Sequence, residues 1–419
     1  MSAQGAAAPI KATGNTLPPR SVVREFPVRI SLTALIAIGS IFAAAPAGTV
    51  PGAEHSTLAT ATANQDVRFQ VAFDTVNRWI EAGAFPGAVL AVGQHGSLVA
   101  LKAFGRTRYL PSSPAMRTDE IFDLASVSKV IGTTSAAAIL YQENKLALDA
   151  PVVKYVPEFG GTPGHAQVTI RELLTHSSGI PTPGLMYKKA STKRGILKQI
   201  YTVPLATPPG AHFKYRDPNF ILLGDVIERI AGEPLNVFLG AHVFGPLGMT
   251  STGYRPSRRL LYRIAPTEFD RVLRHRFVDG EVHDENAYTM GGVSGHAGLF
   301  SSAGDLSIYA QMILNGGAYG QKRILKNSTV ELFTTRQNLP PGSSRALGWD
   351  TPAPGCFAGD LASPHAILHT GFTGTSVYID FDRDAFIILL TNRVFPTRED
   401  ELIASARPQI HTAVLRALR

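Results

Sequence analysis

The chain has 419 residues, and its 44% hydrophobic and 17% charged residues are typical of a globular protein with a sizeable core. The formal net charge of +8 allows attraction to anionic surfaces or substrates. No run of basic residues is interleaved with aromatic ones, so nucleic acid is excluded as an expected partner. Cys356 is the only cysteine, which excludes an intrachain disulfide.

Residues 1–47 are predicted to be a targeting segment. A basic stretch ends at Arg29, an apolar run follows over 30–45, and residues 45–47 are small enough for cleavage. The run is shorter than the ~20 apolar residues of a membrane span, which favours a cleaved signal peptide over an uncleaved N-terminal anchor. In either case we expect the rest of the chain to be exported, to the periplasm or outside the cell. An uncleaved segment would also anchor it to the membrane.

The next stretch, 48–65, is small, polar and rich in Ala and Thr, and is predicted to be a linker. Apolar residues at helical spacing then predict a helix over 67–82. Two apolar runs, 88–93 and 97–104, are separated by a turn that contains Gly96, and they predict a β-hairpin.

The segment 127–144 is predicted to be a helix, because it is rich in Ala, Ile, Leu and Thr and lacks Pro. Ser126 and Lys129 stand at its start and form the only Ser-x-x-Lys of the chain. Residues i and i+3 of a helix lie on one face, so the amine would lie beside the hydroxyl. A neighbouring base or charge activates a hydroxyl as a nucleophile. The alternative is a serine that caps backbone donors at a helix start.

The rest of the chain is mostly helical to about 248, and 221–231 is an amphipathic helix that ends at Gly232. A helix is predicted over 306–314. A second hairpin is expected, with strands at 376–381 and 385–391, and a final helix at 401–418.

Strands at both ends of the chain and helices between them predict an α/β (α+β) fold. We expect an antiparallel sheet flanked by helices, with an inserted, mainly helical subdomain. The predicted domain spans 66–419. Its sheet subdomain would comprise about 66–122 and 295–419, and its helical subdomain about 123–294.

Two more motifs follow Ser126 and Lys129 in the chain, Tyr215-Arg216-Asp217 and His369-Thr370-Gly371. Together these elements resemble the serine β-lactamase and penicillin-binding protein superfamily, most of all its class C β-lactamase-like branch. That branch carries Ser-x-x-Lys, then Tyr-x-Asn or a variant, then Lys/His-Thr-Gly. The resemblance extends from about residue 66 to the C-terminus, through segments such as 146–152, 169–179 and 297–302.

The resemblance implies roles for these residues. Ser126 would be the nucleophile and Tyr215 a proton relay. Lys129 would either take the serine proton or hold positive charge beside the tyrosine, and which of the two is the acylation base stays open. The backbone N–H groups of Ser126 and Phe372 would form an oxyanion hole. Thr370 would donate a hydrogen bond to the substrate.

Three positions of the last two motifs carry specific chemistry. Gly371 would let the strand backbone approach the ligand closely. Asp217 stands where many class C enzymes have Asn, and a carboxylate can only accept hydrogen bonds. It would favour the ammonium form of Lys129, which argues against classical β-lactam turnover. His369 replaces the commoner Lys and carries positive charge only partly at neutral pH, so we expect weaker recognition of a substrate carboxylate.

A loop-rich region with glycines, two histidines and two acids spans 282–296. Its spacing matches no metal-ligand pattern, so we expect a substrate-side loop, no metal and no cofactor. Ser294 does not lie in a Gly-x-Ser-x-Gly motif because position 296 is His, which argues against an α/β-hydrolase. His176 is expected to order its turn.

The sequence thus predicts an exported, monomeric serine hydrolase that forms an acyl-enzyme on Ser126. Its expected substrates are small molecules or peptidoglycan peptides with β-lactam or D-Ala-D-Ala-type amide bonds. A carboxylesterase or D-aminopeptidase of the same fold is an alternative. A non-catalytic, penicillin-recognising sensor or scaffold is the alternative from another class.

Overall fold

The computed structural model describes residues 57–418. The segment predicted to be a signal peptide or anchor, residues 1–47, lies outside the described residues, as does the first part of the predicted linker. Between residues 57 and 418, no helix is both long and apolar enough to cross a membrane.

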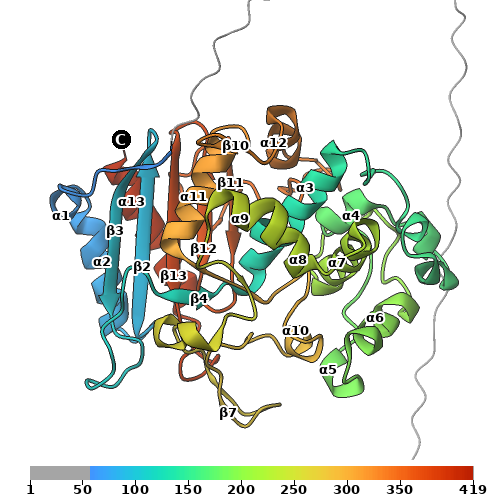
Figure 1. Cartoon of the computed structure of the whole chain (residues 1–419), viewed down its shortest axis with the longest axis horizontal. Helices are drawn as coiled ribbons and strands as arrows, with labels where there is room; N and C mark the ends of the chain where they lie inside the picture. Colours follow the sequence, from blue (N-terminus) through green and yellow to red (C-terminus); the bar gives the residue numbers. More distant parts are fainter. Residues whose placement is uncertain (1–56, 419) are drawn as a thin grey trace, which may run out of the picture. The chain divides into compact units, whose positions relative to one another are not determined.

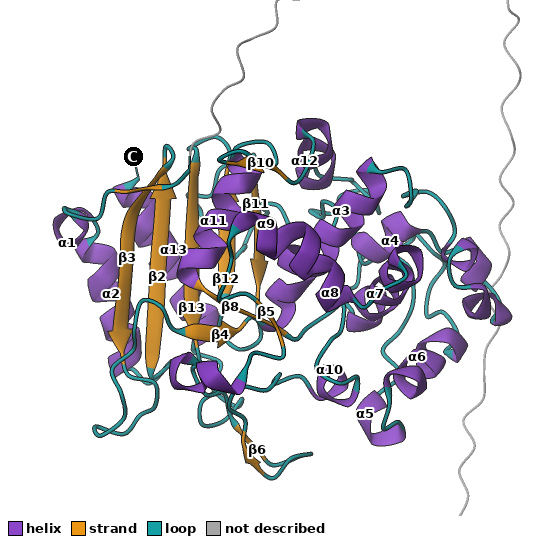
Figure 2. Cartoon of the chain, viewed as in Figure 1, coloured by secondary structure: helices purple, strands orange, loops and turns teal. Residues whose placement is uncertain are grey.

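A six-stranded sheet forms the centre of the described part of the chain (Figures 1 and 2). Its strands follow the order β1-β3-β2-β13-β12-β11, and every neighbouring pair is antiparallel except β1 and β3. Strands from the two ends of the chain therefore meet at β2 and β13, and the predicted antiparallel sheet is confirmed. The strand bounds are β1 Ala59–Thr60, β2 Gly87–Gln94, β3 Ser97–Gly105, β11 Ala366–Thr370, β12 Ser376–Asp380 and β13 Ala385–Thr391.

The edge strand β1 differs from the structureless linker expected at 48–65. The N–H of Ala59 donates to the carbonyl of Gly96 at 3.0 Å, and that of Ala61 donates to Leu98 at 2.9 Å. These bonds join backbone groups only, and β1 is exposed. The small, polar composition of residues 48–65 therefore does not predict that part of this segment pairs with β3.

The sheet is buried on both faces, as β13 illustrates. Phe386 and Ile388 belong to the core on the α11 side, and Ile387 and Leu389 belong to the core under α2 and α13. Successive side chains of a strand point to opposite faces, so a strand covered on both sides is apolar throughout. Figure 1 shows α11 in front of the sheet and α13 behind it. The covering helices are α2 Gln70–Glu81, α11 Ala303–Leu314 and α13 Ile403–Ala417.

The remaining described helices lie mainly beyond the β11 edge of the sheet (Figure 2). The predicted helix over 221–231 is α7, which begins earlier, at Asp217, and ends at Gly232 with φ 73°. The other α-helices are α1 Gln65–Arg68, α3 Ser135–Gln142, α4 Ile170–Leu174, α5 Met186–Lys189, α6 Lys193–Thr202, α8 Leu235–Leu239, α9 Gly245–Leu247, α10 Glu285–Thr289 and α12 Asn327–Thr334.

The smaller strands form a three-stranded sheet and two short hairpins. The sheet has the order β4-β8-β5 and leads directly into the Ser126 segment, because β4 ends at Asp123. The bounds are β4 Ile121–Asp123, β5 Gly253–Tyr254, β6 Phe269–Asp270, β7 Arg276–Phe277, β8 Leu299–Ser302, β9 Ala318–Tyr319 and β10 Lys322–Arg323.

The segment after Ser126 is not the regular α-helix predicted over 127–144. A 3-10 turn over Ala125–Val127 leads into a π-helical stretch, Lys129–Thr134, and α3 follows. The hydroxyl of Thr133 donates to the carbonyl of Gly295 at 2.6 Å, so the widened turn is bonded to a distant loop. Local sequence cannot show this tertiary partner, and π-helical turns are frequent at functional sites.

Candidate active site

Lys129 is buried and lies at the centre of a group of partly buried polar side chains. Its Nζ donates to Ser126 Oγ at 3.0 Å, to Asp217 Oδ1 at 2.8 Å and to the carbonyl of His296 at 3.0 Å. An ammonium has three protons, so these three acceptors satisfy it. Burial disfavours the charge, but Asp217 and Tyr215 outweigh it, and the pKa of Lys129 is raised. Lys129 therefore remains an ammonium at neutral pH.

The turn that presents Ser126 is held by a buried carboxylate. Asp123 accepts from the N–H of Ala125 at 2.8 Å and from that of His283 at 2.6 Å. Ala125 has φ 45°, a left-handed conformation that costs free energy for a residue with a side chain. Asp123 offsets this cost and fixes the direction in which Ser126 points.

The Tyr215 ring lies between two cations and packs against two histidines. Its centroid is 5.1 Å from Lys129 Nζ and 5.9 Å from Arg345 Cζ. The ring centroids of His176 and His369 are 4.4 and 6.0 Å away. The two cations would stabilise negative charge that develops on the tyrosine oxygen as it takes part in proton transfer.

His176 orders the turn that carries Tyr215. It is buried with φ 56°, and its Nδ1 accepts from the N–H of Arg216 at 3.3 Å. Burial, and then the charges of Arg345 and Lys129, lower the pKa of His176 well below its ordinary value. The ring is therefore neutral, which leaves Nδ1 able to accept this hydrogen bond.

His369 and Thr370 end β11 and line a cavity beside Ser126. His369 is buried, and its Nδ1 lies 2.9 Å from the Thr370 carbonyl. Burial, followed by the charges of Arg345 and Lys129, lowers its pKa well below the ordinary value. His369 therefore carries no charge that could attract a substrate carboxylate. Arg345, on the same cavity wall, supplies a positive charge such as a lysine at position 369 would have supplied.

Gly371 allows a close approach within the protein; its expected role in letting a ligand approach stays a prediction. A Cβ there would lie 2.1 Å from Thr375 Oγ1 and 2.4 Å from the carbonyl oxygen of Leu124. The backbone of Gly371 thus packs directly against the segment that leads to Ser126. This contact places the end of β11 beside the turn that presents Ser126.

The two successive peptide groups on either side of Phe372 are each bound by an arginine. The carbonyl of Gly371 accepts from Arg407 Nη2 at 2.5 Å, and that of Phe372 accepts from Arg393 Nε at 2.7 Å. In a planar trans peptide the N–H points away from the C=O, so the first bond turns the Phe372 N–H in the opposite direction. Within residues 57–418 this N–H has no partner, which leaves it free for a substrate oxygen.

Two cavities of different electrostatic character adjoin Ser126. One, of about 440 Å³, contains three arginines on its wall. The other, of about 280 Å³, contains three carboxylates. Ser126, Tyr215 and Phe372 line both. The first is completed by Phe213, Arg345, Asp350, Phe357, Leu368, His369, Thr370, Gly371, Arg393 and Arg407. The second is completed by Ala125, Asp217, His283, Asp284, Glu285, His296, Ala297 and Arg398.

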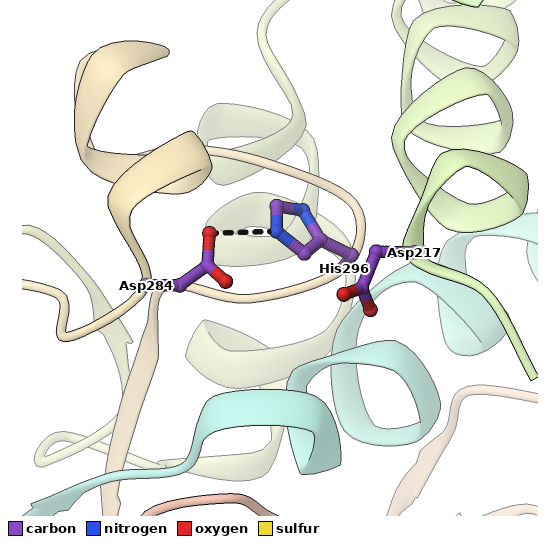
Figure 3. A group of neighbouring side chains, drawn as sticks. All are labelled: Asp217, Asp284 and His296. Atoms are coloured by element: carbon purple, nitrogen blue, oxygen red, sulfur yellow. Dashed lines mark hydrogen bonds and ion pairs between the residues drawn. The ribbon is translucent and has the colours of Figure 1, made fainter. Parts of the chain in front are cut away.

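Asp217, Asp284 and His296 are close enough to share a cation (Figure 3). Their donor atoms lie within 4.8 Å of one another. Each is already engaged, however: Asp217 binds Lys129, and His296 lies 2.8 Å from both Asp284 Oδ1 and Ser294 Oγ. Burial raises the pKa of Asp284, but His296 outweighs burial and holds it below the usual range. A metal would have to displace the adjacent ammonium, so this group fits a metal poorly.

A second acidic group, Glu268, Asp270 and Glu285, is similarly compensated. Arg398 forms ion pairs with both glutamates, and Arg274 Nε lies 2.5 Å from Asp270. Burial opposes the charge on Glu268, yet Arg398 and His283 lower its pKa to about 2. These charges stabilise the loops behind the active site.

The structure thus brings together all the residues predicted for the site. Ser126, Lys129, Tyr215 and Asp217 form one contact group, and His369, Thr370, Gly371 and Phe372 form the facing strand end. Sequence reasoning missed the arginines at 345, 393 and 407. No motif marks them: one lies in a loop, one follows β13 and one lies on α13.

Comparison with known proteins places this geometry in context. The family model described as Beta-lactamase matches residues 72–411. A protein of Escherichia coli (strain K12) named D-alanyl-D-alanine carboxypeptidase is 33% identical over 355 residues, which cover 76% of this chain and 81% of that protein. An N-acetylmuramyl-L-alanine amidase of Bacillus subtilis (strain 168) is 35% identical over 352 residues, covering 76% and 79%.

Solved structures share the fold at lower identity. A penicillin-binding protein homologue from Caulobacter crescentus has a TM-score of 0.68 and 18% identity, with 84% of this chain and 97% of that chain covered. EstCE1, a hydrolase with promiscuous acyltransferase activity, has a TM-score of 0.67 and 22% identity, with 84% and 99% covered.

Proposed function

The chain belongs to the beta-lactamase family and is a serine hydrolase of that family, and on this premise we propose that it cleaves amide bonds whose leaving group carries a carboxylate. Ser126 is the proposed nucleophile, and D-Ala-D-Ala-type peptides are the proposed substrates. The names of the carboxypeptidase and amidase relatives support amide chemistry. Export is also part of the proposal, and its support is the sequence of residues 1–47.

The position of Arg345 carries this proposal. Its guanidinium lines the cavity that contains Ser126, and its Nε is buried without a hydrogen-bond partner. Nη1 lies 3.2 Å from Asp350 Oδ2, and Nη2 donates to the Gly348 carbonyl at 3.1 Å. Nε is shielded from the cavity, so a substrate carboxylate would interact with Arg345 through the charge of the guanidinium in the cavity wall.

The proposed acylation uses the residues gathered around Lys129. The Ser126 oxygen attacks the amide carbonyl carbon while Tyr215, as general base, takes the serine proton. Negative charge forms on the carbonyl oxygen, which faces the N–H groups of Ser126 and Phe372. The C–N bond then breaks, Tyr215 gives the proton to the leaving nitrogen, and an ester on Ser126 remains. The raised pKa of Lys129 supports Tyr215 over Lys129 as the base in this proposal.

Deacylation reverses these roles with water. Tyr215 takes a proton from water, and the oxygen of that water attacks the ester carbonyl carbon. The bond between this carbon and the Ser126 oxygen breaks, and the tyrosine returns its proton to the serine. Lys129 holds positive charge beside both oxygens throughout, with Asp217 keeping the ammonium in place.

Neutral esters are a weaker candidate substrate class. They would use Ser126 equally well, but they would offer no negative charge to the guanidinium of Arg345 in the cavity wall. A non-catalytic binding role is disfavoured, since a binding site has no need of a serine hydroxyl bonded to a buried ammonium that also lies beside a tyrosine ring.

The test is a matched pair of substrates, an acylated D-Ala-D-Ala peptide and its C-terminal amide, with p-nitrophenyl butyrate as a neutral ester. The free acid should be hydrolysed at least ~10-fold faster in kcat/KM, since it alone supplies a charged partner for Arg345. Arg345→Gln should remove that preference, and because Arg345 also lies beside Tyr215 it should slow the ester as well, so the ratio of acid to amide is the readout. Ser126→Ala should abolish all three reactions. Equal rates for acid and amide in the unmodified protein would contradict the proposal.

A further inference from the structure

The arginine-lined cavity carries more positive charge than the protein compensates. Three guanidinium groups, Arg345, Arg393 and Arg407, face one carboxylate, Asp350. Asp350 pairs with Arg345, whereas neither of the other two arginines has a carboxylate partner anywhere in residues 57–418. Because His369 is neutral, the lining residues carry an excess of two positive charges; Asp400, Glu401 and Glu268 act on Arg393 only from beyond ion-pair distance.

The hydrogen bonds of these two arginines go to uncharged carbonyl oxygens. Arg393 donates from Nε to Phe372 and from Nη1 to Asp400 O at 2.5 Å, while Arg407 donates from Nη2 to Gly371 and to Thr375 O at 3.1 Å. Nη2 of Arg393 and Nη1 of Arg407 make no bond among the described residues, and Nε of Arg407 is buried without a partner. The protein thus leaves donors unused in a site where unused donors are costly.

The two guanidinium groups also repel each other. Burial, and then the charge of Arg393, lower the pKa of Arg407 to about 9. At neutral pH both groups still carry their charge. Like charges held together in a partly buried site are stabilised when an anion binds between them, as charged groups in protein interiors are normally paired.

We propose that this cavity binds a leaving group with two carboxylates, as an acidic D-amino acid would provide. The proposal rests on the function proposed above and specifies its substrate further. One carboxylate would accept from Arg345, beside His369 and Thr370. The second would lie between Arg393 and Arg407, toward α13. Two negative charges would then balance the two positive charges that the lining leaves over.

A simpler role for Arg393 and Arg407 is to hold the carbonyls on either side of the Phe372 N–H. That role predicts slower turnover of every substrate when either arginine is lost, with no change in preference among leaving groups. The two-carboxylate site instead predicts a change in preference. The experiment must therefore measure selectivity and not rate alone.

The experiment compares acyl-D-Ala-D-Glu with acyl-D-Ala-D-Gln, which have almost the same size and differ by one charge. The full chain should favour D-Glu by ~10-fold or more in kcat/KM, as a charge-assisted hydrogen bond supplies that much discrimination. Arg407→Gln should bring the ratio close to one. Arg416→Gln removes an exposed charge from the same helix, away from the cavity, and should leave the ratio unchanged.

Calorimetry separates this proposal from the proposed hydrolase. N-acetyl-D-glutamate should bind the Ser126→Ala protein more tightly than N-acetyl-D-glutamine, by a similar factor. Hydrolysis of both peptides at equal rates would overturn the two-carboxylate site and leave the hydrolase standing. Selective binding without hydrolysis of either peptide would overturn the hydrolase and leave the anion site standing. A ratio that Arg407→Gln does not alter would also overturn the site.

Discussion

At the scale of single residues, the contact between Asp217 and Lys129 decides the proton chemistry. Asp217 occupies a position where an uncharged amide is common in class C relatives, and its carboxylate lies 2.8 Å from the ammonium. The resulting charge pair raises the pKa of a fully buried lysine that burial alone would lower. The mechanism proposed above therefore assigns the base to Tyr215, a choice that the sequence left open.

Replacing Asp217 tests this assignment. Asp217→Asn removes the attraction that favours the ammonium, so the pKa of Lys129 should fall. If the reaction needs protonated Lys129, activity is lost as pH rises through that pKa. The alkaline limb of kcat/KM should then move to lower pH by about one unit or more, the shift that a neighbouring charge typically causes.

Asp217→Glu, which keeps the charge, is the matched control and should retain the alkaline limb. A limb that stays in place in Asp217→Asn would show that protonated Lys129 is not required. The measurement is kcat/KM between pH 6 and 11 with one amide substrate.

Residue patterns predicted the candidate catalytic residues but not the arginines of the proposed anion site. Ser126, Lys129 and Tyr215 belong to short motifs whose order along the chain is diagnostic. Arg345 and Arg407 come from a loop and a helix that only the folded chain brings to the cavity. Nor could the sequence show that His369 is buried, and burial is what removes its charge.

At the scale of elements, the site lies where the end of β11 meets the turn before Ser126. The two segments are joined by bonds from Thr373 and Thr375 to the carbonyls of Asp123 and Leu124, at 2.7 and 3.0 Å. Gly371 packs directly against the same turn. The relative position of the nucleophile and the Phe372 N–H therefore depends on this junction.

Gly371→Ala should disturb catalysis much more than folding. The new Cβ would overlap the Leu124 carbonyl, which is backbone and cannot rotate away. A displacement of about 1 Å between reacting groups lowers kcat by roughly 100-fold, and we expect a loss of that size with a smaller change in KM.

Gly240→Ala is the control for this substitution, since a Cβ added at Gly240 would have no atom within 4 Å. Both proteins should unfold at similar temperatures. A Gly371→Ala enzyme with a kcat within a few-fold of the unmodified protein would show that the junction tolerates movement.

Element prediction succeeded where periodicity was strong and failed where tertiary contacts decide the geometry. The hairpins β2–β3 and β12–β13 follow from apolar runs and turn residues, and α7 from its amphipathic spacing. The π-helical stretch after Ser126 depends on bonds to residues 295 and 296, which lie about 160 positions away in the chain. The division of residues 66–419 into a sheet subdomain and a helical subdomain stays a prediction.

At the scale of the whole molecule, buried neutral histidines couple folding to pH. His411 on α13 is fully buried, and its Nε2 lies 3.1 Å from Ser376 Oγ of the sheet. Burial, and then Arg407, lower the pKa of His411 to about 3. In the unfolded chain a histidine titrates near 6.5.

The two pKa values of His411 determine whether the free energy of unfolding rises or falls with pH. Between pH 6.5 and 3 the unfolded chain takes up a proton at His411 that the folded protein does not. The free energy of unfolding therefore falls as pH decreases through this range, by up to ~1.4 kcal/mol per pH unit for one such group.

His411→Gln removes this contribution. Urea unfolding at pH 6.5 and pH 5 should show a smaller loss of stability on acidification than in the unmodified protein, by roughly 1–2 kcal/mol. His212→Gln, at an exposed position, should behave like the unmodified protein. If both variants lose the same stability as the unmodified protein between the two pH values, His411 is not a neutral, buried histidine.

The central claim is that Ser126 becomes covalently acylated, and intact-mass spectrometry after brief incubation with a penicillin tests it most directly. The unmodified protein should gain the mass of one penicillin, on the peptide that contains Ser126, and Ser126→Ala should gain none. An adduct of the same yield on Ser126→Ala, or one located on another residue, would contradict the account.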